Sequence, residues 1–160
     1  RLLGWIKEIA DNIIDTSHLT LHELRRFVLN TYGESDVKMR INLMSFGSAY
    51  GLPMEADMVL DVRFLPNPYF VDELREKTGL SHEVKEFIRS QVEYTEYFDM
   101  LSKFVLYLIP LYEKEGKSYL TISIGCTGGK HRSVMVVDSL AEHLRENGYN
   151  VSTMHRDVDR

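Results

Sequence analysis

The segment that most constrains the fold is residues 119–146, where an apolar run, a glycine-rich loop and an amphipathic stretch follow one another directly. The run YLTISI has the length and the β-branched content of a buried strand. Apolar residues from Val134 to Leu144 then recur at helical spacing, and Asn147-Gly148 provides a helix stop. A strand that passes through a tight loop into a helix is the repeating unit of α/β proteins, so this segment predicts that class.

Three more segments carry strand patterns, and one long segment carries a helical pattern. Residues 37–46 alternate apolar and polar side chains, 56–65 contain a continuous apolar run, and 149–155 are rich in β-formers. Residues 81–114 are predicted to be helical, and Pro110 is expected to kink or end that helix. Strands that alternate with helices predict an α/β domain with a mainly parallel sheet flanked by helices.

The first 35 residues differ from the rest of the chain. Asn12 to Asp15 form a short apolar stretch that is typical of a strand, and Thr20 with Glu23 forms a capping-box pattern ahead of a helix. The chain does not begin with methionine, so we interpret it as a fragment of a longer protein. We expect an N-terminal helical extension, residues 1–35, followed by a domain at 36–160.

Composition excludes several classes of protein. The 160 residues are 44% hydrophobic, which suits a globular domain with a real core, and a net charge of −5 argues against a uniformly basic nucleic-acid surface. One cysteine excludes an internal disulfide framework and favours the cytoplasm. There is no apolar run of membrane-spanning length and no signal-peptide pattern. The six histidines lack metal-ligand spacing, so we expect no metal.

The loop IGCTGGKHRS, residues 124–133, has the chemistry of a phosphate site. It lies where a strand passes into a helix, and ligands of α/β sheets bind at that edge. Glycines bring backbone N–H groups close to an anion, and the helix N-terminus favours negative charge. The cations of Lys130 and Arg132 and the hydroxyls of Thr127 and Ser133 can also bind phosphate oxygens. The predicted phosphate-binding residues are Thr127, Gly128, Gly129, Lys130, His131, Arg132 and Ser133.

Two other interpretations of this loop remain open. It could be a polar turn, and its Cys126-x5-Arg132-Ser133 spacing also matches cysteine phosphatases, in which a thiolate attacks a phosphoryl group. In that alternative the catalytic residues would be Cys126 and Arg132, with Asp61 or Asp57 as general acid. The spacing excludes a Walker A loop, because four residues do not separate the first glycine from Gly-Lys-Ser/Thr.

A second polar cluster follows the first two strands of the main domain. If these strands are parallel neighbours, their ends meet the loop at one edge of the sheet. Asp61 and Arg63, with Asn67 beyond them, would then add a carboxylate, a cation and an amide to the phosphate site. Ser45 and Gly47 end the first strand at the same edge.

Three motifs occur together in this chain and point to a known family. The stretches SFGSAYGLPMEAD, DVRFLPNPY...LREKTGL and IGCTGGKHRSV, followed by HRDV, closely resemble the C-terminal domain of the RapZ/YvcJ family of bacterial RNase adapter or nucleotide-binding proteins. The resemblance covers residues 37 to about 158. Residues 1–35 look like the tail of the family's N-terminal P-loop domain together with the interdomain helix. ATP or GTP binding is implied for that P-loop domain. No cofactor is implied for the fragment itself.

The resemblance implies a sensor and adapter without an enzymatic activity of its own. Its implied partners are a phosphorylated amino sugar such as glucosamine-6-phosphate, a small regulatory RNA, an endoribonuclease and a second copy of the chain, as a homodimer or higher oligomer. Carried over by motif, the sugar-phosphate site uses Thr127, Gly128, Gly129, His131 and Arg132, with Asp61, Arg63 and the position of Tyr69. The enterobacterial members have histidine in place of Tyr69. Candidate RNA contacts are Lys38, Arg40, Lys130, His155 and Arg156.

Overall fold

The computed structural model describes residues 4–32 and 39–160, and the chain divides into two compact units, 1–37 and 38–160. The first unit contains helices α1 (Gly4–Ile9) and α2 (Leu21–Tyr32). The capping box forms as predicted, because the Thr20 N–H donates to Glu23 Oε2 at 2.8 Å and the Glu23 N–H donates to Thr20 Oγ1 at 3.2 Å. The strand predicted at Asn12–Asp15 is wrong, since this stretch has irregular backbone.

The second unit is built on a parallel sheet. Its strands are β1 (Arg40–Gly47), β2 (Met58–Asp61), β3 (Tyr119–Cys126) and β4 (Asn150–His155). They lie in the order β2-β3-β1-β4, and every pairing is parallel. The two central strands are buried along most of their length, which explains their nearly continuous apolar sequence. The predicted α/β class with a parallel sheet is confirmed.

Three helices and two short 3₁₀ turns connect these strands. The turns are η1 (Ser48–Tyr50) and η2 (Pro68–Phe70), and the helices are α3 (His82–Arg89), α4 (Val92–Glu115) and α5 (Arg132–Glu146). The helix predicted after the glycine loop is confirmed as α5. No helix within the described ranges has the length and apolar content needed to cross a bilayer.

The long helical region predicted over 81–114 is confirmed, but the structure divides it into two helices. The Ser90 N–H closes α3 by bonding to Glu86 O, and Gln91 then adopts an extended conformation before α4 begins. Pro110 does not end α4, which continues to Glu115 although proline lacks the N–H that would complete this part of the helix.

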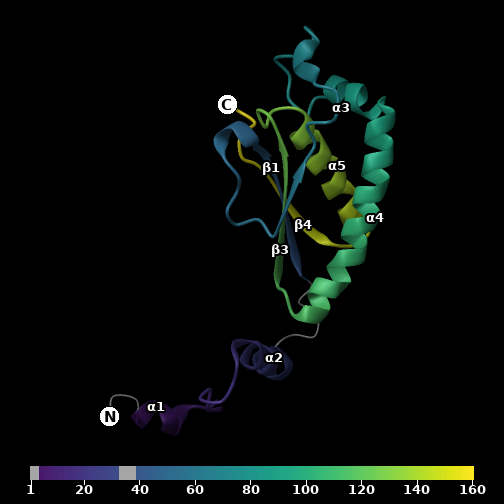
Figure 1. The fold of residues 1–160 in the computed structure, drawn as a ribbon. Coiled ribbons are helices and arrows are strands. Elements are labelled where there is room, and N and C mark those ends of the chain that lie inside the picture. Colours follow the sequence, from purple (N-terminus) through teal and green to yellow (C-terminus); the bar gives the residue numbers. More distant parts are fainter. Residues whose placement is uncertain (1–3, 33–38) are drawn as a thin grey trace. The chain divides into compact units, whose positions relative to one another are not determined.

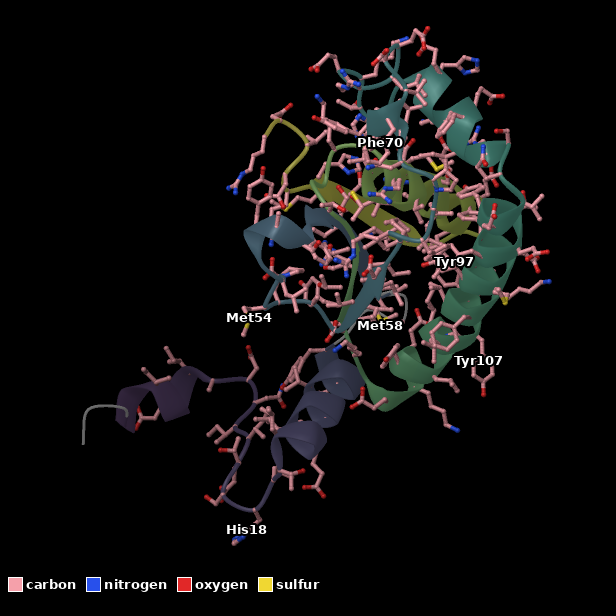
Figure 2. All side chains as sticks on the ribbon, turned by 45° about the horizontal axis from the view of Figure 1, so that its top comes forward. His18, Met54, Met58, Phe70, Tyr97 and Tyr107 are labelled. Atoms are coloured by element: carbon pink, nitrogen blue, oxygen red, sulfur yellow. The ribbon has the colours of Figure 1, made fainter. Side chains whose placement is uncertain are left out.

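The helices of the second unit lie on one side of its sheet (Figure 1). Helix α5 packs directly on β1, β3 and β4, and α4 and α3 pack against α5. The core between these layers contains Leu43, Ile122, Ile124 and Leu140, all at most 1% exposed. Other apolar side chains stay at the surface, such as Tyr107 on α4 and Met54 in the connection between β1 and β2 (Figure 2). The arrangement leaves the carboxyl ends of all four strands at one edge of the sheet.

A candidate phosphate-binding site

Parallel pairing brings the predicted site segments together at the carboxyl edge of the sheet. Gly47, the last residue of β1, pairs with Cys126, the last residue of β3. Asp61 at the end of β2 pairs with Gly125, and His155 at the end of β4 pairs with Ser45. The strand ends that the sequence suggested as neighbours are therefore neighbours, and the loop 126–132 leaves the sheet at their centre.

Backbone contact locks the loop against the end of β1. A Cβ atom on Gly47 would lie 2.7 Å from the carbonyl carbon of Gly128, and one on Gly129 would lie 2.6 Å from the Gly47 nitrogen. Gly129 also has φ +78°, a conformation that other residues adopt at a cost. Only glycines at these two positions let the two backbones approach so closely, which gives the loop a defined shape.

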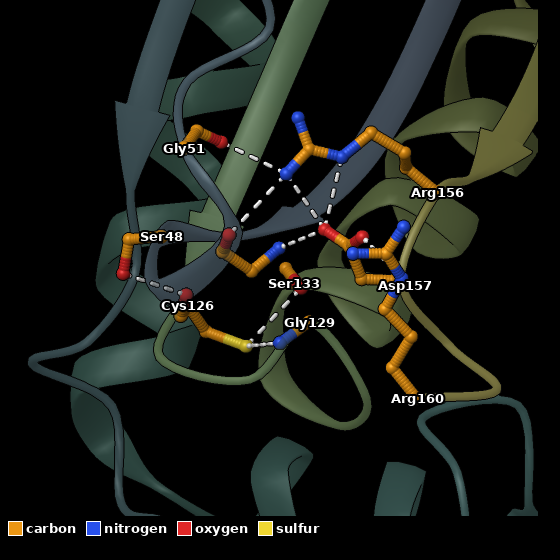
Figure 3. A network of polar contacts seen from close by, with 9 residues as sticks. Ser48, Gly51, Cys126, Gly129, Ser133, Arg156, Asp157 and Arg160 are labelled. Carbon is orange, nitrogen blue, oxygen red and sulfur yellow. Dashed lines mark hydrogen bonds and ion pairs between the residues drawn. The ribbon is translucent and has the colours of Figure 1, made fainter.

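Arg156 and Asp157, which follow β4, also stabilise this contact between the loop and the end of β1 (Figure 3). Asp157 is completely buried, and its Oδ2 accepts from the Gly47 N–H at 2.8 Å and from Arg156 Nη2 at 2.7 Å. Arg156 also donates to the carbonyls of Gly47 and Gly51. Burial opposes ionisation of Asp157, but the hydrogen bonds from Arg156 and Gly47 outweigh it and hold the pKa of this carboxyl below its ordinary value.

Cys126 is part of the loop's internal frame (Figure 3). Its side chain is 3% exposed, and its Sγ accepts from the Gly129 N–H at 3.3 Å and lies 3.2 Å from Ser133 Oγ. Its carbonyl oxygen accepts from Ser48 Oγ at 3.1 Å. These contacts tie together the two ends of the loop and the η1 turn.

Arg132 is also a framing residue in this structure. Its Nη1 donates to the carbonyls of Arg63 at 2.8 Å and Leu65 at 3.0 Å, and its Nη2 donates to Thr127 Oγ1 at 3.3 Å. The residue is 5% exposed. Arg132 thus forms a bridge between α5, the loop and the segment after β2, and it also lines the cavity, so its positive charge stays at the site. The two-pronged grip on phosphate oxygens that the sequence suggested stays a prediction.

The segment 67–80 closes another side of the loop. His131 Nε2 lies 3.1 Å from Arg75 O, so this nitrogen carries the proton, and the Gly79 N–H donates to Lys130 O at 2.9 Å. Burial lowers the pKa of His131, against the opposing effect of the Arg75 carbonyl, and keeps the ring neutral at pH 7. Lys130 Nζ forms a looser ion pair with Glu76 at 3.6 Å.

These segments enclose a cavity of about 360 Å³. That volume lies within the usual range for small-molecule sites. Of the predicted site residues, the lining contains Asn67, Tyr69, Thr127, Gly128, Lys130, His131 and Arg132; it also contains Tyr50, Arg75, Glu76, Cys126 and Arg160.

Asp61 and Arg63 lie at the same edge but bond to each other. Arg63 Nε donates to Asp61 Oδ2 at 2.7 Å, and both side chains are about half exposed, at 51% for Asp61 and 55% for Arg63. The bond from Arg63 holds the pKa of Asp61 below its ordinary value, so this carboxyl is ionised near neutral pH and does not act as an acid. Asp57, the other acid considered, precedes β2 at the opposite end of the sheet, where Lys117 and the Thr121 N–H bind it.

Among the residues that the structure describes, the candidate RNA contacts do not form one patch. Lys38 lies outside the described residues. Arg40 begins β1, so roughly 23 Å of strand separates it from the edge that carries Lys130. His155 is bonded to Ser45 Oγ at 2.9 Å, and Arg156 is committed to the contacts around Asp157.

Four cavity residues and one buried carboxylate were not assigned a role from the sequence. Tyr50, Arg75 and Glu76 lie inside motifs that the resemblance used, but only the fold shows that they line the cavity. Arg160 and Asp157 follow β4 in a stretch that reads as a solvated terminus, and no local pattern distinguishes a buried aspartate from an exposed one.

The second unit is therefore an α/β domain with a candidate anion site, because the glycine-rich loop between strand and helix lines a cationic cavity. Residues 39–159 match the RapZ C-terminal domain, and the chain belongs to that family.

Curated relatives agree with this assignment over nearly the whole chain. A nucleotide-binding protein of Finegoldia magna is 48% identical over 158 residues, which is 98% of this chain and 55% of that protein. Nucleotide-binding proteins of Geobacter sp. (strain M21) and Anaeromyxobacter sp. (strain K) are 44% and 48% identical over 160 residues, 99% of this chain and 56% and 54% of theirs. The chain thus spans about half the length of the relatives it matches.

Proposed function

We propose that this domain is a non-catalytic sensor that binds a phosphorylated amino sugar of the glucosamine-6-phosphate type in the cavity beside the loop 126–132. The observation that carries the proposal is the cavity lining itself: Thr127 and the Gly128 backbone lie beside Lys130, while the Glu76 carboxylate and the Asn67 amide lie at the same cavity. Hydroxyl, amide and ammonium groups suit a phosphate. A carboxylate and an amide oxygen suit the sugar's ammonium and hydroxyls.

Calorimetric titration of the chain with glucosamine-6-phosphate, glucose-6-phosphate and inorganic phosphate tests this proposal. We expect the amino-sugar phosphate to bind most tightly, Lys130→Gln to weaken binding about tenfold through loss of a charge-assisted bond, and Cys126→Ser to keep most of the affinity. The absence of heat from all three compounds at millimolar concentration would reject the proposal.

The same proposal places the protein in the control of amino-sugar and cell-envelope metabolism in the cytoplasm, with regulatory RNA and an endoribonuclease as partners and an oligomer as its working form. Membership of the RapZ family supports this part. We assign the nucleotide binding in the relatives' names to the part of those proteins that this chain does not match. A gel shift at several salt concentrations tests RNA binding, because phosphate contacts by Lys130 and Arg40 make affinity fall steeply with salt.

One observation favours a second candidate, a cysteine phosphatase. The Cys126 thiol contacts the Ser133 hydroxyl and accepts the Gly129 N–H, and both donors would stabilise a thiolate. Against it stand the distant position of Asp57 and the ion pair of Asp61, the two residues suggested as the acid that protonates the leaving oxygen. Phosphate release from several phosphomonoesters that disappears in Cys126→Ser would establish the enzyme and overturn the sensor.

A further inference from the structure

The cavity contains four cationic side chains, and they differ in how fully they are bound to the protein. A phosphomonoester carries up to two negative charges and needs donors that can turn toward it. Arg132 has little freedom to turn toward a ligand, because Arg63 O, Leu65 O and Thr127 Oγ1 hold its terminal nitrogens, while its Nε is buried and has no hydrogen-bond partner among the described residues. Its role is to place charge and frame the loop.

Of the remaining three cations, Arg75 has firm partners and Lys130 has a looser one. Arg75 Nη2 donates to Asp72 at 2.7 Å, and its Nε donates to the Tyr69 carbonyl at 3.1 Å. Lys130 Nζ forms an ion pair with Glu76 Oε2 at 3.6 Å. Turning Arg75 toward a ligand would break two hydrogen bonds of the segment 67–80, and that segment also holds His131.

Arg160 is the most exposed of the four cations. Its Nε lies 3.5 Å from Asp157 Oδ1, longer than the usual charge-assisted bond, and its side chain is 58% exposed. Gly47 and Arg156 supply three N–H bonds to Asp157 Oδ2, whereas the buried Oδ1 has no hydrogen-bond partner among the described residues and only this long ion pair with Arg160. The Arg160 backbone is nonetheless fixed, because its N–H donates to Asp157 O at 3.4 Å.

The second contact of Arg160 is with Tyr50. The guanidinium carbon lies 4.9 Å from the centre of the Tyr50 ring, which is 46% exposed and lines the cavity. Tyr50 ends the η1 turn, which is fastened to the phosphate loop by Ala49 N–H to Thr127 O at 3.2 Å and Ser48 Oγ to Cys126 O at 3.1 Å. The ring is therefore held in a fixed place beside the loop, and a cation that can move covers its face.

We propose that Arg160 is the cation that completes the phosphate site, and that the Tyr50 ring packs against the apolar face of the sugar. When Arg160 turns from Tyr50 to the phosphate oxygens, it contributes a two-pronged guanidinium contact and uncovers the ring for the C–H groups of the hexose. This inference rests on the proposed sugar-phosphate function. It assigns the phosphate to Arg160, which follows β4, and the sugar to the neighbouring Tyr50, which follows β1.

The test is calorimetric titration of the parent chain and its variants with two probes, glucosamine-6-phosphate and inorganic phosphate. Arg160→Gln is expected to weaken binding of both probes about tenfold, and Arg160→Lys to recover part of the loss. Tyr50→Ala is expected to weaken the sugar phosphate by roughly five- to tenfold and inorganic phosphate by less than about twofold, whereas Tyr50→Phe behaves as the parent. Lys103→Gln is the charge control, because Lys103 is 73% exposed on α4 and pairs with Asp99.

The possible outcomes separate this inference from the function on which it rests. If the parent binds neither probe, the proposed function fails. If the parent binds and Arg160→Gln matches Lys103→Gln, the role of Arg160 is refuted while the sensor stands. If Tyr50→Ala loses affinity for both probes equally, the ring does not read the sugar, and that half of the proposal is wrong. The two side chains are exposed enough for their variants to fold, and melting temperatures verify this.

Discussion

At the scale of single residues, Gly128 and Gly129 are neighbours with different structural roles. A Cβ on Gly129 would meet Gly47 and Asp157, and its φ is +78°, whereas a Cβ on Gly128 would meet nothing within 4 Å. We predict that Gly129→Ala destabilises the domain by about 2 kcal/mol or more and lowers its melting temperature by roughly 8 °C. Gly128→Ala should change stability by less than about 0.5 kcal/mol. Equal melting temperatures for the two variants, measured by calorimetry, would contradict this account of the loop.

Asp157 connects a single carboxyl group to the acid stability of the domain. Since its pKa is lowered in the folded state, its contribution is complete above the ordinary value of 3.8 and is lost as pH falls through the lower, folded value. We predict that Asp157→Asn costs about 2–4 kcal/mol at pH 7 in urea unfolding, and that the difference from the parent narrows below about pH 3.8. Asp159→Asn removes an equal charge from an exposed neighbour and serves as control. If the free energies of unfolding of Asp157→Asn and the parent differ by a constant amount down to pH 2, the lowered pKa of Asp157 does not contribute to acid stability.

The residues of the loop show how far the sequence alone could lead. The glycines, hydroxyls and cations of GCTGGKHRS predicted a phosphate site because their chemistry is local. That Cys126 belongs to the frame of the loop was the favoured interpretation of the sequence, but the partners of Cys126 and Arg132 were not predictable, because they lie far along the chain, such as Ser48 and Leu65. For the same reason Asp157 looked like a residue of a solvated end.

At the scale of elements, Arg132 joins the start of α5 to the segment after β2. We predict that Arg132→Gln lowers the free energy of unfolding by about 2–4 kcal/mol, since it removes the donor from the Arg63 carbonyl and from the buried Leu65 carbonyl. Lost ligand binding in this variant would therefore not identify a phosphate contact. Thermal unfolding of Arg132→Gln beside Lys130→Gln checks this, and a stable Arg132→Gln that fails to bind would instead make Arg132 a direct ligand.

The elements themselves were mostly predictable, and their arrangement was not. Apolar periodicity located four strands and α5 because burial on one or two faces determines which residues are apolar. The order β2-β3-β1-β4 and the break at Ser90-Gln91 depend on packing between distant segments, which no local pattern records.

At the scale of the whole molecule, the second unit contains a complete core of its own. The buried apolar cluster extends from Met39 to Val151 and includes residues from all of the strands β1, β3 and β4 and from the three helices α3, α4 and α5. The candidate cavity is likewise lined only by residues between Tyr50 and Arg160. Stability and ligand binding should therefore both belong to this unit.

We accordingly predict that removing residues 1–37 leaves a fragment that unfolds in one cooperative transition, within a few degrees of the corresponding transition of the whole chain. A ligand at a concentration of about 100 times its Kd stabilises the folded state that binds it by about 2.7 kcal/mol. For a domain of this size, that raises the melting temperature by roughly 10 °C. Glucosamine-6-phosphate should raise the melting temperature of the fragment and of the whole chain equally in calorimetric scans. A fragment that folds but shows no shift, beside a whole chain that does, would place part of the site in the first unit and refute the assignment of the cavity.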